Sequence, residues 1–356
     1  MKNFRHIALL VMTTALAAGC VKTELAVKEK EVIFSVGSRA LMTKAVEEVT
    51  EFDSFSSKGY LHAEGVAGVQ DFFGAAGETI TKTDVGGGEY NWLPSHIYYW
   101  PKHNGSYVNF VSWYDNGTPA PAVTETSITW TNRTVGTDDN ILVANKAWYQ
   151  KANVQNYFTP GVPTLFKHLL AKVTVRAKST IESKTVGDVE TAWTLKISDF
   201  QLHNVYTSGS LSLTNTTPPA DSESLKITEW TGDWTITGTT TDVPGPAGST
   251  TLGASDYTNV VAMRSVLPQA VADIYMSFKY EVTTTTTNSV THSTHTFTES
   301  VDVANLALNT FTGYTGDWVM NKIITYNINI NPETGAIVII PVADTWTSAS
   351  KEIMVE

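Results

Sequence analysis

Few residues in this chain have the types and spacing that direct chemistry requires. His292 and His295 could be a pair of metal ligands, but residues three apart on a strand face opposite sides and would not converge. Asp138, Asp139 and Asn140 offer the oxygen ligands that calcium prefers, yet the spacing of an EF-hand loop is absent. A solvated loop or a strand cap explains them more simply. We therefore predict no metal site and no cofactor.

Motifs for phosphate binding and catalysis are also missing. Residues 74–79 lack the lysine of a phosphate-binding loop, and the glycines at 86–88 are better explained as a turn. No nucleophile, base and orienting acid can be assembled from the sequence, although a carboxylate pair for glycoside hydrolysis would be invisible at this level. We predict no catalytic residues and a protein that is not an enzyme.

The amino-terminal segment carries the clearest chemical signal. Lys2 and Arg5 precede an apolar run over residues 7–18 that is too short to span a bilayer, which is typical of an export signal. The segment ending at Cys20 resembles a bacterial lipobox, with Leu16 one place further from the cysteine than usual. Cys20 is the only cysteine, so it cannot form an internal disulfide and is better explained by lipid modification. The alternative is an ordinary signal peptide containing Cys20, and the mature protein is exported with either interpretation.

The residues that follow predict a strand and a cleavage site. Residues 31–36 would place Val32, Phe34 and Val36 on one face of an extended segment, which indicates a strand rather than a polar tether. A flexible site with an exposed basic residue, Arg39, comes next, and a trypsin-like protease could cut between Arg39 and Ala40. Such a cut would sever the first strand from the domain that it helps to close. The alternative is that Arg39 is a solvated turn residue in a stable hairpin.

Length and composition limit the class of protein. The 356 residues suffice for two ordinary domains after removal of the signal, and 42% hydrophobic residues allow a sizeable core. Charged residues make up only 17%, while Thr, Asn, Ser and Gly are abundant, which favours short strands and turns. The net charge of -11 argues against nucleic acid as a partner, because phosphates would be repelled. No second apolar run could cross a membrane, so attachment would be through lipid alone.

The hydrophobic pattern predicts an all-β protein. No stretch longer than about ten residues has a convincing helical period. A linker is predicted around residues 214–221, where two prolines stand among small polar residues, and this arrangement suggests two sandwiches. A bulge is expected between Ile197 and Phe200. The predicted strands cover residues 59–63, 95–101, 107–114, 165–177, 193–202 and 274–282, with a terminal hairpin of 324–330 and 337–340.

Aromatic residues gather in the first half of the chain and could stack on sugars. Such rings more often fill sandwich cores or subunit contacts. Trp100 and Trp113 are the candidates that we name for glycan stacking.

Several segments, taken in order, carry a family resemblance. They are the lipobox at Cys20, the strand to Val36 followed by Arg39, and residues 98–101, 139–144, 168–175, 267–269, 326–331 and 341–346. No single motif is specific, but the ordered set is, and it covers most of the chain. The set resembles the Bacteroidales fimbrillin-like family, the subunits of lipoprotein-derived type V pili.

The resemblance implies a fold of two transthyretin-like β-sandwiches in tandem. The expected divisions are a signal peptide (1–19), a lipidated propeptide with the first strand (20–39), an amino-terminal sandwich (40–217) and a carboxyl-terminal sandwich (218–356). The resemblance also implies that an arginine-specific protease removes the first strand and that a carboxyl-terminal strand from a neighbouring subunit replaces it. The candidate donor strands are the segments around Ile337 and Ile339 and around Ile353 and Val355.

The implied function is a structural and adhesive subunit of a cell-surface fimbria. Its partners would be other pilin subunits, the outer membrane through lipid on Cys20, and a ligand on a host or bacterial surface. The alternative is a monomeric surface lipoprotein that binds glycan or another ligand and never polymerises. Retention of the strand before Arg39 would favour that alternative.

Overall fold

The protein is built from β-strands, which confirms the predicted class. The computed structural model describes residues 31–38, 51–86, 89–103, 105–150, 161–216, 226–311, 313–314 and 316–346. Within these ranges the only helical element is the single-turn 3-10 helix η3 (Leu308–Thr310). Among the described residues, no helix has the length and apolar character needed to span a bilayer.

The strands are numbered in chain order. They are β1 (Phe34–Ser38), β2 (Ser54–His62), β3 (Gln70–Asp71), β4 (Glu78–Gly86), β5 (Glu89–Pro94), β6 (Tyr107–Asp115), β7 (Ala122–Val123), β8 (Ser127–Thr134), β9 (Ile141–Ala144), β10 (Lys146–Gln150), β11 (Val162–His168), β12 (Ala171–Ser179), β13 (Ser183–Val186), β14 (Val189–Thr214), β15 (Lys226–Thr228), β16 (Trp234–Pro244), β17 (Thr250–Leu252), β18 (Thr258–Val266), β19 (Tyr275–Asn288), β20 (Thr294–Ala307), β21 (Lys322–Ile330) and β22 (Ile337–Thr345).

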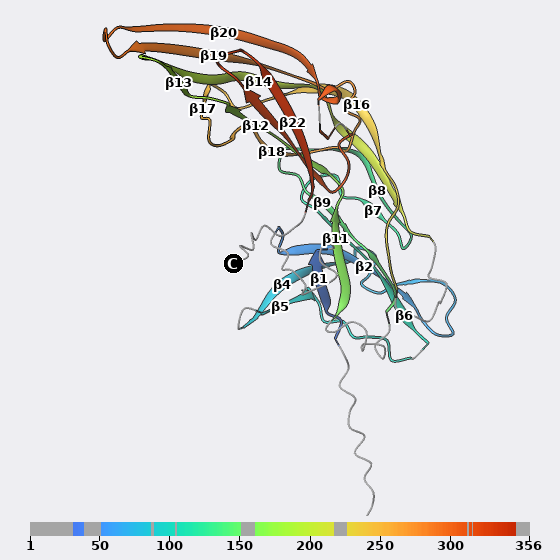
Figure 1. Cartoon of the computed structure of the whole chain (residues 1–356). Helices are drawn as coiled ribbons and strands as arrows, with labels where there is room; N and C mark the ends of the chain where they lie inside the picture. The colour runs from blue at the N-terminus through green and yellow to red at the C-terminus, as the bar shows by residue number, and fades with distance from the viewer. Residues whose placement is uncertain are drawn as a thin grey trace, which may run out of the picture.

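A ten-stranded sheet forms one end of the elongated molecule (Figure 1). Its order is β15-β10-β6-β9-β11-β1-β5-β4-β2-β3, and β6 also pairs with β2. The extra pairing closes a ring through β6, β9, β11, β1, β5, β4 and β2, so β1 has a neighbour on each side. Inside the ring lies a core rich in aromatic rings, including Phe34, Phe55, Phe110 and Phe166.

Two further sheets enclose a second core. A four-stranded sheet has the order β18-β12-β21-β22, and an eight-stranded sheet contains the path β20-β19-β14-β8-β7. Alternation explains the burial: Val173 on β12 and Ile328 on β21 face Phe278 on β19 within one hydrophobic cluster. The long hairpin of β19 and β20 extends to the far end of the molecule (Figure 1).

A third core joins the sheets. It contains Trp130, Ile141, Leu211, Leu267 and Trp346, which come from both halves of the sequence. The 26-residue strand β14 runs through this region, because one part pairs with β19 and another with β8. The expected boundary between residues 217 and 218 stays a prediction, and the pairing of β12 with β21 favours a boundary before residue 171.

Two predicted strands differ from the observed ones. Residues 95–101 do not form a strand, because the hydroxyls of Ser95 and Tyr98 donate hydrogen bonds to the Glu78 carboxylate and anchor the segment through side chains. The strand predicted over 165–177 is two strands, β11 and β12, separated by the buried turn at Leu169 and Leu170 where the chain changes sheets.

Other predictions are confirmed. Strand β6 covers residues 107–114, β19 covers the predicted strand from residue 275, and the terminal hairpin pairs β21 with β22 over nine residues. The bulge expected between Ile197 and Phe200 is present, since the register of β14 on β19 shifts between Ser198 and His203 and Asp199 has a positive φ of 52°.

Candidate functional site

The candidate site is the place that β1 occupies in the ring. The side chains of Val32, Phe34 and Val36 are 1%, 4% and 6% exposed, so the face predicted from alternation is the buried one. β1 pairs in parallel with β11 over five residues, from Phe34 opposite Val162 to Ser38 opposite Phe166. On its other side, Phe34 pairs with Trp92 of β5. The strand therefore fills a gap in the ring with both backbone and side-chain contacts.

Phe34 is the centre of the packing around β1. Its ring meets Phe110 at 5.4 Å and Phe55 at 5.8 Å, both edge to face, and Phe73 at 6.4 Å. Burying each large apolar side chain contributes about 1.5–3 kcal/mol. An empty β1 position would thus expose a deep apolar groove that another alternating strand could fill.

Gly161 permits the close approach of β1 to the start of β11. A Cβ at this position would lie 2.7 Å from the carbonyl oxygen of Ile33, which is too close for any other residue. The same carbonyl accepts a hydrogen bond of 2.8 Å from the amide of Val162. The receiving side of the site is therefore shaped to hold a backbone in the β1 position.

Several predicted site residues lie outside the described residues. These are the lipidation residue Cys20, the processing residues Arg39 and Ala40, and the donor candidates Ile353 and Val355. In the sequence Arg39 directly follows Ser38, the last residue of β1, so the predicted cut falls at the end of the inserted strand.

The other donor candidates belong to β22, which is folded into the four-stranded sheet. Ile339 is 6% exposed, and Ile337 packs partly against the same core. All nine residues of β22 pair with β21. β22 is an edge strand, and none of the described strands pairs with its other side. Freeing this strand would break a full ladder and uncover core side chains.

Trp100 and Trp113 are both partly buried rather than presented as a platform. Trp100 packs against the core inside the ring and meets Phe110 edge to face at 5.9 Å. Trp113 packs against the third core. The two rings therefore belong to different clusters, which does not favour joint stacking on one sugar chain.

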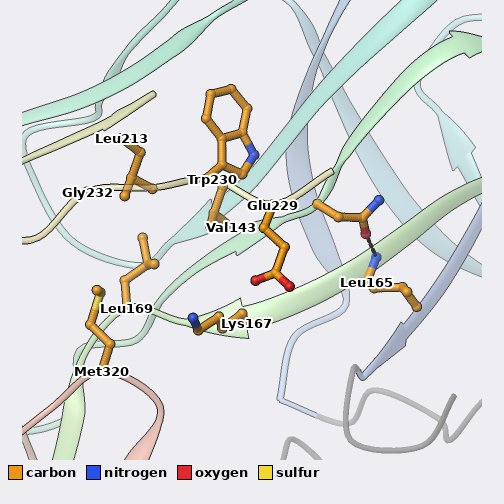
Figure 2. Close-up of a pocket in the computed structure, with 10 residues that line it drawn as sticks. Val143, Leu165, Lys167, Leu169, Leu213, Glu229, Trp230, Gly232 and Met320 are labelled. Atoms are coloured by element: carbon orange, nitrogen blue, oxygen red, sulfur yellow. Dashed lines mark hydrogen bonds between the residues drawn. The ribbon is translucent and has the colours of Figure 1, made fainter. Parts of the chain in front are cut away.

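A small open recess lies near the third core (Figure 2). The side chains of Trp230, Glu229 and Lys167 gather around it. The indole of Trp230 donates to the carbonyl of Ala144, so its polar edge is already used. The remaining lining comes from Val143, Asn145, Leu165, Leu169, Leu213, Gly232 and Met320.

Buried polar groups near the ring were not predicted. Burial alone would raise the pKa of Glu78, but hydrogen bonds from Ser95, Tyr98 and His96 hold that pKa below its usual value. Lys146 is fully buried, although lysine is normally exposed. The signal available in the sequence is its position inside the apolar run of residues 141–149. No group of three or more metal-binding side chains occurs within the described ranges.

Comparisons with known proteins agree with the resemblance in the sequence. A family model described as fimbrillin-like matches residues 61–346. No curated protein matches. Among solved structures, a fimbrial protein from Bacteroides vulgatus is 13% identical with a TM-score of 0.49, covering 89% of this chain and 99% of that chain. The fimbrial anchor protein from Porphyromonas gingivalis is 10% identical with a TM-score of 0.32, covering 91% and 100%.

The protein thus has an all-β architecture in which an amino-terminal strand is inserted into a closed ring. Because the family model covers most of its length, the chain belongs to the fimbrillin-like family. Membership of this family supports a role as a subunit of a cell-surface fimbria.

Proposed function

We propose that this protein is a fimbrial subunit that is exported as an outer-membrane lipoprotein through Cys20 and polymerises by strand exchange. In this proposal a cut after Arg39 releases β1, and a strand from a neighbouring subunit fills the vacated groove. We further propose that the chain consists of two transthyretin-like sandwiches in tandem, the first built on the ring and the second on the two sheets around the other core.

One observation carries the proposal. β1 lies between β11 and β5, and Phe34 and Val36 of β1, together with Val32 just before it, fill the ring. It is the first described strand and ends one residue before Arg39. Because β1 precedes all the other described strands, a cut after Arg39 would separate it from the chain that forms the rest of the ring. Backbone pairing with β11 and the pockets for alternate side chains would then recognise a donor strand.

We assign the donor to the segment that contains Ile353 and Val355. In an extended conformation Ile353 and Val355 would share one face and could enter the pockets of the groove, with Met354 on the other face. The alternative donor, around Ile337 and Ile339, is less suitable because β22 already pairs along its whole length with β21.

The test is the amino terminus of the protein recovered from the cell surface, measured by mass spectrometry beside an unheated gel. A terminus at Ala40 and a ladder of heat-sensitive multimers are expected. Arg39→Ala should retain the lipid-modified Cys20 and lose the ladder. Lys44→Ala is the matched control, since it removes a nearby basic residue and should change neither result. Ile353→Asp should keep the Ala40 terminus but abolish the ladder.

A multimer ladder that persists in Arg39→Ala would contradict strand exchange at this site. A lipid-modified terminus with no ladder in the unaltered protein would instead favour a monomeric lipoprotein that binds glycan. The recess beside Trp230 and Lys167 is the observation that supports this second function.

A further inference from the structure

Lys146 on β10 is a buried amine without a hydrogen-bond partner. Its side chain is 0% exposed, and Nζ makes no hydrogen bond within the described part of the chain. Nζ lies 3.1 Å from the centroid of the Trp148 ring. Burial lowers the pKa of Lys146 to about 7, against the opposing attraction of Glu125. A large fraction of the amine is therefore neutral near pH 7, which is the nucleophilic form.

Asn109 lies on β6, the strand that pairs with β10, and its side chain is held in a fixed orientation. Its side chain is 1% exposed. Oδ1 accepts a hydrogen bond of 2.6 Å from the backbone amide of Tyr149, which is turned toward it by a bulge with a φ of 52°. Nδ2 donates to Glu125 Oε1 at 2.6 Å. One end of the amide thus meets a donor that polarises the carbonyl, and the other meets a carboxylate that can carry a proton.

The register places Lys146 and Asn109 on one face of neighbouring strands. Ala147 is opposite Phe110, so Lys146 aligns with Val111, and residues two apart on a strand share a face. Diagonal cross-strand neighbours of this kind lie about 7–8 Å apart, within reach of a long side chain. The lysine needs only to swing from Trp148 toward Asn109 within its own face of the sheet.

We propose that Lys146 and Asn109 form an intramolecular amide bond that ties β10 to β6. The neutral Nζ attacks Cγ of Asn109 and forms the new C–N bond. A proton from Nζ passes to Nδ2 through the Glu125 carboxylate, the Cγ–Nδ2 bond breaks, and ammonia leaves. Glu125 returns to its starting state, and no oxidant or cofactor is consumed. Since the chain has a single cysteine, no internal disulfide could provide such a tie.

The test is a protease digest of the full-length protein recovered from cells, analysed by tandem mass spectrometry. The expected product is a peptide that contains Lys146 joined to one that contains Asn109, with the summed mass reduced by one ammonia. Asn109→Ala should give none of this product. Glu125→Gln, which keeps the shape of the side chain but not its proton-carrying role, should lower the linked fraction by about tenfold or more.

Lys172→Met is the matched control, because Lys172 also lies over a tryptophan ring, at 4.1 Å from that of Trp346. This variant should keep the linked peptide. Separate, unlinked peptides from the folded unaltered protein would overturn the proposal, whatever the variants do. A linked pair reduced by one water would overturn the assignment to Asn109, because it would join Lys146 to Glu125. Loss of ammonia without a linked pair would also count against it.

Discussion

His168 is the most strongly perturbed basic side chain at the junction of the cores. Its ring stacks on Trp346 at 3.6 Å, and its Nε2 lies 3.3 Å from a carboxylate oxygen of Glu51. Burial, helped by the charge of Lys172, lowers the pKa of His168 to about 2. The folded protein therefore holds this histidine neutral, although Glu51 is close.

The pH dependence of stability should reflect this histidine. An unfolded histidine takes up a proton below about pH 6.5, whereas the folded one resists it, so the unfolded state binds more protons as the pH falls. Stability is then fully present above pH 6.5 and declines toward pH 2, by at most about 1.4 kcal/mol per pH unit from this group. His168→Gln should flatten the decline, as measured by urea unfolding between pH 7 and pH 4.

His292→Gln is the control for this prediction, because His292 is exposed on the turn between β19 and β20. It should leave the slope unchanged. An equal slope in His168→Gln and in the unaltered protein would show that His168 is not the group responsible.

At the scale of strands, alternation was the reliable signal. It predicted the buried face of β1 through Val32, Phe34 and Val36, because one face must meet the core. It failed at residues 95–101, where the backbone makes only an isolated bridge between Tyr99 and Glu31 and the Tyr98 hydroxyl donates a hydrogen bond to Glu78. Such contacts join residues distant in sequence, so local pattern cannot anticipate them. The burial of Lys146 was missed because lysine is normally exposed, although its place in the apolar run of residues 141–149 was a local signal.

Phe34→Ala should lower the stability of the precursor but not that of the assembled form. In the precursor the substitution removes a ring from the core and should lower the free energy of unfolding by about 3–5 kcal/mol. If β1 is released on maturation, the assembled multimers no longer contain this residue. Their heat resistance on a gel should therefore equal that of the unaltered protein.

Ser35→Ala is the control on the same strand, because Ser35 is only partly buried and lies on the opposite face. It should change neither the precursor nor the multimers by more than about 0.5 kcal/mol. Multimers of Phe34→Ala that dissociate at a lower temperature would show that β1 stays in the assembled subunit.

At the scale of the whole molecule, the third core should make the stability of each end depend on that of the other. Trp130 and Ile141 come from the first half of the sequence, and Leu267 and Trp346 from the second. β14 pairs with strands on both sides of this core. The linker composition near residue 217 suggested separate sandwiches, because a sequence pattern reveals local breaks but not a core shared between distant segments. The shared core therefore predicts a single cooperative unfolding transition, even for a chain built of two sandwiches.

Leu211→Ala tests this coupling, because Leu211 is 0% exposed within the third core. The substitution should cost about 2–5 kcal/mol. If the core joins both ends, calorimetry should show one transition that moves as a whole to lower temperature, with coincident changes in tryptophan fluorescence and circular dichroism. Leu195→Ala, in the core between the other two sheets, should shift the same single transition. Two transitions, of which Leu195→Ala moves only one, would mean that the ends unfold separately and that the shared core contributes little to their cooperation.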